Sequence, residues 1–285
     1  VAQVGRLEEA RNSLDEAVRL AGTEARNSVV AAACLSELGF VLGYRGKVAD
    51  AVSAFNQASA LKAPHNYSFE LASMWEVKHA DFLTKIGNVD QARAIAKATL
   101  KTSNRRSWKQ DFAACHVILG RLDLQQQQFG TAREHFDIAE SIFRRGHMLT
   151  DLADLLLAQA RLHLQLENLE EAERHLEESV RISSPRELVL VRVDGLNLRA
   201  QVLLRKHRAR RSNAATADVD AALDAADSSL SITRSCGYLW AERDAHALLR
   251  EIWTELKNPV KATEHSHANQ QLSASLTIKK NRKGR

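Results

Sequence analysis

Proline, glycine and cysteine are all scarce in this chain of 285 residues. Three prolines and 12 glycines are too few for the many turns of an all-β protein. They are typical of a mostly helical chain, because proline breaks helix interiors and a glycine within a helix costs about 1 kcal/mol relative to alanine. The three cysteines, Cys34, Cys115 and Cys236, are odd in number and widely spaced, which argues against a disulfide framework. They favour a reducing compartment, so we expect a cytoplasmic protein.

Long apolar runs are lacking as well. No segment approaches the ~18 consecutive apolar residues that a membrane-spanning helix needs, so we expect no membrane association. Hydrophobic residues at 45% and charged residues at 26% are ordinary values for a globular protein rather than a disordered one. The chain begins at Val1, with no initiator methionine and no signal peptide, and we interpret it as a piece of a longer protein.

The net charge of +5 comes from two short segments. Residues 279–285 carry five positive charges and no negative ones, so this segment alone equals the net charge of the chain. A second basic cluster, with the sequence RKHRARR, occupies residues 205–211. We predict a mobile, basic inserted loop at about 205–218 and a disordered basic tail at 279–285. Either could grip phosphates, but neither has the interleaved aromatic residues that strand recognition would need.

Residues 1–278 are predicted to form one domain built from an internal repeat. An alanine follows a polar turn at nearly constant intervals, in segments such as GRLEEA, GKVADA and GNVDQA. These alanines are separated by 41, 41, 40, 40, 50 and 40 residues: Ala10, Ala51, Ala92, Ala132, Ala172, Ala222 and Ala262. A period of about 40 residues, with one interval lengthened by ten, indicates a repeat protein.

Each repeat has the pattern of two amphipathic helices. In the second repeat, Leu35, Leu38 and Leu42 share one helical face, while Ala51 and Phe55 mark the face of the partner helix. A small residue recurs in the first helix of each repeat, where it would let the two helices approach closely: Gly39, Ala80, Gly120, Ala160 and Ala200.

This small–large–small pattern resembles the tetratricopeptide-repeat family over nearly the whole chain. The usual repeat of that family has about 34 residues, so a period of 40 predicts longer helices or longer loops. The long repeats are similar to those of kinesin light chains and of the C-terminal sensor arrays of STAND-class signalling ATPases. The run Gly237–Trp253 resembles bacterial members of such regulators, and we expect its tryptophans, Trp240 and Trp253, to close the C-terminal end against Leu249 and Leu256. The predicted fold is all-α, a right-handed α-solenoid of tetratricopeptide-like hairpins with about six helix pairs and a leading helix.

Signatures of catalysis are missing. The sequence has no GxSxG or HExxH motif and no paired CxxC motif. The segment Gly39–Lys47 lacks one glycine of a phosphate loop, and Val48 stands where a hydroxyl would hold magnesium. We therefore expect no enzyme, no catalytic residues and no cofactor.

Candidate metal ligands do not converge in the sequence. His265 and His267 are two residues apart on a predicted helix and point in different directions, with His246 on the preceding helix. Cys115 is followed by His116, but His116 and His163 fall on core positions, where we expect hydrogen-bonded interior histidines. No metal site is predicted.

Surface recognition is the function that the predicted architecture favours. The repeat register places a set of polar residues from the stacked first helices along a concave groove: Lys78, Asp81, Lys85, Arg121, Gln125, Arg161, Gln165, Asn197, Gln201 and Arg205. Four of these, Lys78, Arg121, Arg161 and Arg205, would form a basic ladder that suits carboxylates or an acidic peptide. They could equally be ordinary surface charges paired with nearby acids.

The expected function is a non-catalytic scaffold that binds a protein or another ligand. We expect it to be the sensor or partner-docking region of a larger bacterial signalling or regulatory protein. The STAND resemblance implies an adjoining ATPase domain outside this chain, which ligand binding on the array would release from inhibition. Two alternatives stay open: a nucleic-acid-associated helical adaptor that uses the basic segments, and a stand-alone peptide-binding co-chaperone.

Overall fold

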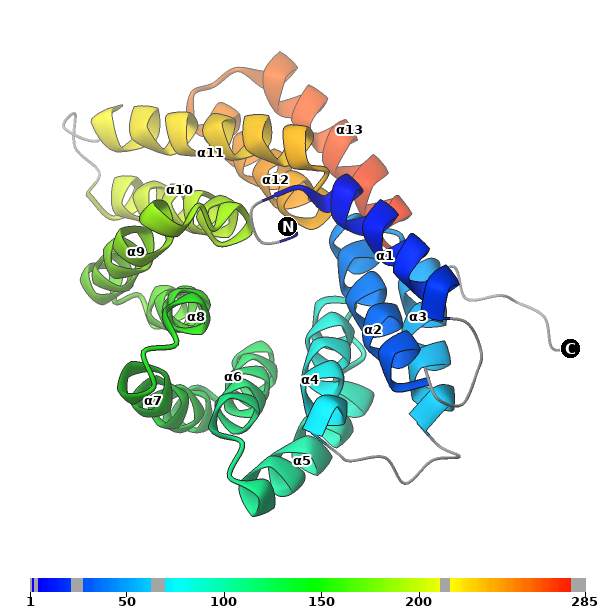
Figure 1. Cartoon of the computed structure of the whole chain (residues 1–285). Coiled ribbons are helices and arrows are strands. Elements are labelled where there is room, and N and C mark those ends of the chain that lie inside the picture. The colour runs from blue at the N-terminus through cyan, green and yellow to red at the C-terminus, as the bar shows by residue number, and fades with distance from the viewer. Residues whose placement is uncertain (1, 3–4, 22–27, 63–69, 211–215, 278–285) are drawn as a thin grey trace, which may run out of the picture.

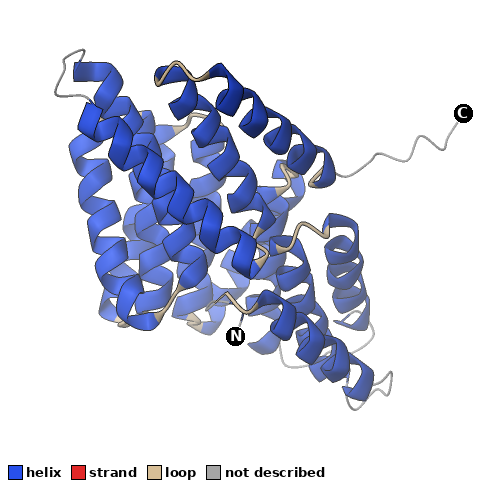
Figure 2. Cartoon of the chain, turned by 90° about the horizontal axis from the view of Figure 1, so that it is seen from above, coloured by secondary structure: helices blue, strands red, loops and turns tan. Residues whose placement is uncertain are grey.

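The computed structural model describes residues 2, 5–21, 28–62, 70–210 and 216–277. Over these ranges the chain is helical and has no strand (Figure 2). No helix among them is long and apolar enough to cross a membrane. The α-helices are α1 Leu7–Ala21, α2 Ser28–Tyr44, α3 Val48–Lys62, α4 Glu70–Lys85, α5 Val89–Arg106, α6 Lys109–Gln125, α7 Phe129–Arg145, α8 Leu149–Gln165, α9 Leu169–Ser183, α10 Val189–Arg210, α11 Thr216–Cys236, α12 Leu239–Glu255 and α13 Pro259–Ser275.

The helices form hairpins that stack into an α-solenoid. After the leading helix α1, each even-numbered helix packs against the odd-numbered helix that follows it, which gives six pairs in the described chain. Figure 1 shows α2, α4, α6, α8 and α10 on the inner side of a ring, with α3, α5, α7, α9 and α11 outside them. The predicted all-α solenoid, with its leading helix and six pairs, is confirmed.

The period of 40 residues comes from two nearly equal halves. A residue with positive φ follows successive helices at 20-residue steps: Gly87, Ser107, Gln127, His147, Glu167 and Glu187. After Gln127, the amide of Gln128 donates to the carbonyl of Asp123 at 2.9 Å, which is the Schellman arrangement at a helix end. Because α6, α7 and α8 each contain 17 residues, a half-repeat consists of one such helix and a three-residue turn. The long repeat therefore reflects long helices with tight turns.

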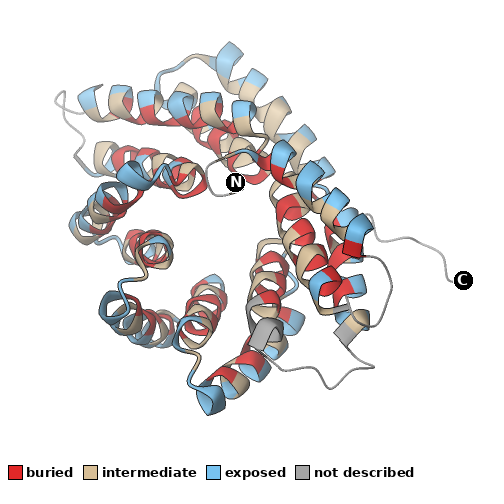
Figure 3. Cartoon of the chain, viewed as in Figure 1, coloured by how far each residue is buried: buried red, intermediate tan, exposed pale blue. Residues whose placement is uncertain are grey.

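Small residues let the two helices of a repeat come close together, as predicted. A Cβ atom placed on Gly120 would lie 2.5 Å from Cε1 of Phe136 on the partner helix, so no larger residue fits there. Ala80, Ala160 and Ala200 occupy the equivalent positions and are fully buried. Figure 3 shows the buried residues concentrated on the faces where helices meet. Packing at this density is what holds a solenoid together, because each repeat can bury its apolar faces only against its neighbours.

The lengthened repeat is accommodated by longer helices, so the prediction of a loop at 205–218 was wrong in most of its extent. Helix α10 has 22 residues and ends at Arg210, and α11 has 21 residues and begins at Thr216. Arg205 and Lys206 form ion pairs with Glu167 and Glu173 of the preceding hairpin. These contacts hold the segment in the helix. Residues 211–215 and the predicted basic tail, 279–285, lie outside the described part of the chain.

The two ends of the solenoid meet and close the ring. The indole Nε1 of Trp240, in α12, donates to the carbonyl oxygen of Gly43, in α2, at 2.8 Å. The rings of Tyr44 and Tyr238 lie 4.7 Å apart. Gly46 has φ +70°, and a Cβ atom on it would lie 2.6 Å from Leu276. Trp240 therefore does not cap the C-terminal end against Leu249, as the sequence had predicted, but joins that end to the first full repeat.

We predict that replacing Trp240 weakens this closure. Trp240→Phe removes the indole donor, and the carbonyl of Gly43 keeps only its hydrogen bond from the amide of Gly46. The loss of this one hydrogen bond should lower the free energy of unfolding by about 1 kcal/mol. Trp253→Phe is the matched control, because Trp253 packs within the cluster formed by α10, α11 and α12 and not across the junction. Urea unfolding of both variants checks this, and an equal loss in the two would contradict a special role for Trp240.

Candidate functional site

The inner faces of the ring enclose two neighbouring cavities, of about 290 and 190 Å³. Side chains from α2, α4, α6, α8 and α10, together with Phe143 of α7, line the larger one. Side chains from α4, α6, α8 and α10 line the smaller one. Four residues line both cavities: Asp81, Arg121, Asp154 and Asp194. The two cavities therefore adjoin, and we call the combined space the lumen.

Arg121 lies where the two cavities meet and is neutralised by two aspartates. Its guanidinium donates to Asp81 at 2.9 Å and to Asp154 at 2.7 Å, which links α4, α6 and α8. Burial alone would lower the pKa of Arg121, but Asp154 and Asp81 raise it above its usual value. Burial would in turn raise the pKa of Asp154, but Arg121 and Lys85 lower it. Arg121 is therefore a structural link between repeats.

Two other cations line the smaller cavity without an ion pair to any described carboxylate: Lys85 and Arg161. The ammonium of Lys85 lies 4.8 Å from the ring centroid of Tyr44, a cation–π arrangement. Burial opposes the charge of Lys85, but Tyr44, Asp81 and Asp194 raise its pKa, so the side chain is protonated at neutral pH. Lys85 and Arg161 are thus the positive groups of the lumen that are available to a ligand.

Acidic groups collect at the opposite end of the lumen. Asp111 and Asp151, in the first turns of α6 and α8, line only the larger cavity. Burial and the neighbouring Asp154 raise the pKa of Asp151. Burial also raises the pKa of Asp194, which accepts a hydrogen bond from the hydroxyl of Tyr238 at 3.1 Å. The lumen is therefore acidic toward the start of α6 and α8 and basic toward the end of α4 and α8.

The structure brings together seven of the ten residues predicted to line a groove, all of them from α4, α6 and α8: Lys78, Asp81, Lys85, Arg121, Gln125, Arg161 and Gln165. Lys78 is ion-paired with Glu37, and Gln125 donates to the carbonyl of Thr84 at 3.4 Å. The predicted basic ladder is consequently interrupted by acids at Lys78 and Arg121.

The three predicted residues from α10 line neither of these cavities. Asn197 is 4% exposed and donates to the carbonyl of Ala241 in α12 at 2.9 Å. Arg205 is paired with Glu167, and Gln201 is partly buried outside the lumen. The reason is that α10 meets the lumen with its first turns only, through Asp194 and its neighbours, while its second half packs against α11 and α12.

Apart from Asp81, the aspartates of the lumen were missed, although the sequence carries a signal for them. Asp111 and Asp151 are one 40-residue period apart, and so are Asp154 and Asp194. An acid that recurs at the period of the repeat occupies the same position in successive first helices, and that position faces the lumen. The register was applied at other positions of the first helices, which left these four residues out.

The family model of the tetratricopeptide repeat matches residues 153–185, which cover most of α8 and all of α9. The hairpin of α8 and α9 therefore contains a tetratricopeptide repeat, and the other hairpins of the described chain stack beside it in one solenoid. Tetratricopeptide solenoids are typically non-catalytic scaffolds. No curated protein sequence matches the chain.

Several solved structures share the fold at low sequence identity. A Rap protein complexed with competence and sporulation factor is 12% identical, with a TM-score of 0.69, over 95% of this chain and 71% of that one. Aspartyl phosphate phosphatase F from Bacillus subtilis is 13% identical, with a TM-score of 0.62, over 93% and 68% of the two chains. BtubC (BKLC) from P. vanneervenii is 17% identical, with a TM-score of 0.51, over 82% and 92%.

We predict that Arg121 matters for stability. Arg121→Met leaves Asp81 without its cation inside the lumen, which should cost about 1–3 kcal/mol of unfolding free energy at neutral pH. Because the same change removes the group that lowers the pKa of Asp154, that pKa should rise. Arg199→Met, at an exposed position of α10, is the control and should be nearly neutral. Urea unfolding with NMR titration of the carboxylates checks both effects, and a wild-type stability for Arg121→Met would contradict the structural role.

Proposed function

We propose that this tetratricopeptide-repeat protein is a non-catalytic scaffold that binds a segment of a partner protein or a peptide in its lumen. The observation that carries the proposal is the pair of unpaired cations, Lys85 and Arg161, inside a closed ring. Buried charges in proteins are normally paired, so two that lack an ion pair in a water-accessible cavity are suited to an incoming anion. A carboxylate is the matching group, and Arg161 can hold it through two parallel hydrogen bonds.

The acidic and basic ends of the lumen indicate how charge should be distributed along the ligand. A purely acidic peptide would fit Lys85 and Arg161 but would be repelled at the end where Asp111 and Asp151 lie. We propose a segment that carries a carboxylate at one end and a cationic group at the other. The aromatic ring of Tyr44 and the apolar side chains of the larger cavity, such as Val117 and Leu190, would contact its apolar part.

Two considerations support a role in bacterial signalling, which we include in the proposal. A Rap protein bound to a factor and an aspartyl phosphate phosphatase from Bacillus subtilis have the same solenoid. This architecture is therefore one that holds a partner in another protein. All three cysteines are free thiols, which suits the reducing cytoplasm. We retain the proposal that the chain serves as a sensor or docking region beside an effector domain.

Binding of nucleic acid is less favoured by the structure. Lys206 and Arg208 of the basic cluster are paired with Glu173, Glu251 and Glu255. Charges neutralised within the protein contribute little to the release of counterions that drives binding to a phosphate backbone.

The proposal is tested with a library of short peptides of random sequence. Peptides retained by the full chain are identified by mass spectrometry, and the affinity of the best one is measured by fluorescence polarisation for the wild type, Arg161→Gln and Arg199→Gln. Loss of a charged hydrogen bond should weaken binding about tenfold or more in Arg161→Gln.

Arg199→Gln, which removes an exposed arginine outside the lumen, should bind as the wild type does. Circular dichroism establishes that the variants keep their helices. If Arg161→Gln binds the selected peptide as tightly as Arg199→Gln, the lumen is not the docking site.

A further inference from the structure

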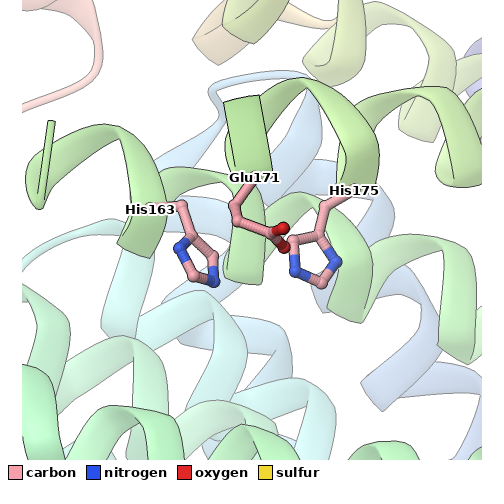
Figure 4. Close-up of side chains that lie close together, drawn as sticks. All are labelled: His163, Glu171 and His175. Atoms are coloured by element: carbon pink, nitrogen blue, oxygen red, sulfur yellow. The ribbon is translucent and has the colours of Figure 1, made fainter. Parts of the chain in front are cut away.

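A group of three potential metal ligands lies between α8 and α9. His163 comes from the last turn of α8, and Glu171 and His175 come from successive turns of α9. One ligand atom from each lies within 4.8 Å of the other two. In Figure 4 each imidazole turns one nitrogen toward the space between the two rings, and the carboxylate of Glu171 projects into that space. Glu171 and His175 reach it together because residues four apart share one face of a helix.

The hydrogen bonding of the two histidines is incomplete, which differs from the prediction of a hydrogen-bonded interior His163. The Nδ1 atoms of His163 and His175 are both buried and have no hydrogen-bond partner among the described residues. His175 is 5% exposed, and the two rings are stacked with centroids 5.2 Å apart. Buried polar atoms in folded proteins normally have partners, so neither ring is oriented by a hydrogen bond at its Nδ1 atom.

Arg174 contacts two members of this cluster. Its guanidinium donates to Oε2 of Glu171 at 2.8 Å, and another of its nitrogens lies 3.2 Å from Nε2 of His175. Because a guanidinium has only donors, Nε2 of His175 accepts in this contact and presents its lone pair to the cluster. The side chain of Arg174 is 57% exposed, so it can swing into solvent when another cation takes its place.

We propose that His163, Glu171 and His175 bind one Zn²⁺ ion, which displaces Arg174. Two imidazoles and one carboxylate are a ligand set that zinc favours, and three protein ligands leave the fourth position open to water. Zinc bonds of ~2.0–2.2 Å require the ligand atoms to lie roughly 3.3 Å apart. Rotations of the three side chains provide this movement, since all three belong to one hairpin with a fixed backbone.

Two other histidine pairs in the ring do not offer the same ligands. His116 and His135 approach through their Nδ1 atoms at 2.8 Å, as do His246 and His265. In each pair the facing nitrogens are engaged with one another and no third ligand completes a group in the described chain. The proposed site is therefore specific to the hairpin of α8 and α9.

The site is tested by titrating the metal-free full chain with zinc sulfate in a calorimeter. We expect one Zn²⁺ per chain, and a melting temperature that rises with the zinc concentration, because a ligand that binds the folded state stabilises it. Glu171→Gln and His163→Asn should each weaken binding by about tenfold or more. His267→Asn removes an exposed histidine outside the cluster and should change nothing.

The variant Arg174→Gln distinguishes a metal site from a purely structural cluster of side chains. Removing the competing guanidinium should tighten zinc binding about two- to fivefold, a change that loss of a stabilising residue would not produce. Cobalt(II) in place of zinc should give the intense visible absorption of a four-coordinate site in the wild type and lose it in Glu171→Gln. Equal zinc affinity in the wild type and Glu171→Gln, or loss of binding in His267→Asn, would overturn the proposal.

Discussion

The contact between the two ends of the solenoid determines what the rest of the molecule can do. A stack of helical hairpins needs only neighbour contacts to fold, and by itself it leaves one open concave face. Here Trp240, Tyr238 and Leu276 pack against the first full repeat, so the concave face becomes the inside of a ring. The first helices then border the lumen, where side chains are partly removed from water.

The position of an ion pair inside the ring changes how much it contributes to stability. On an open surface, Arg121 and Asp154 would be an ion pair of little consequence, because exposed pairs contribute about 0–1 kcal/mol. Inside the ring the same pair is screened less by water, and an uncompensated partner would be costly. The charges of Arg121 and Lys78 are met by acids of neighbouring repeats, whereas Lys85 and Arg161 are left to interact with an aromatic ring or with a ligand. Which charges are paired and which are unpaired, rather than the net charge of +5, therefore determines what kind of ligand the lumen can bind.

The periodicity of the sequence predicts the hairpins, but it does not predict the ring. The intervals between turn alanines, and the small residues such as Gly120 opposite Phe136, report local packing within one repeat, which recurs and can therefore be read from the chain. Closure depends on a contact between Gly43 and Trp240, which are 197 positions apart and belong to no repeating pattern. The same limit applies to the site: the repeat register and the structure both put Lys85, Arg121 and Arg161 on the inner side of the ring, but the register does not account for α10, where Asn197 donates to the carbonyl of Ala241 in α12.

Helix α8 contributes a residue to each of the two proposed binding sites. Arg161 and His163 are two residues apart, so they leave the helix in different directions, Arg161 into the lumen and His163 toward α9. In the same helix, Leu155 and Leu156 are fully buried in the core cluster. They pack α8 against both neighbouring hairpins. A cation bound by His163, Glu171 and His175 would therefore link α8 to α9 on a different side of α8 from the one that carries Arg161.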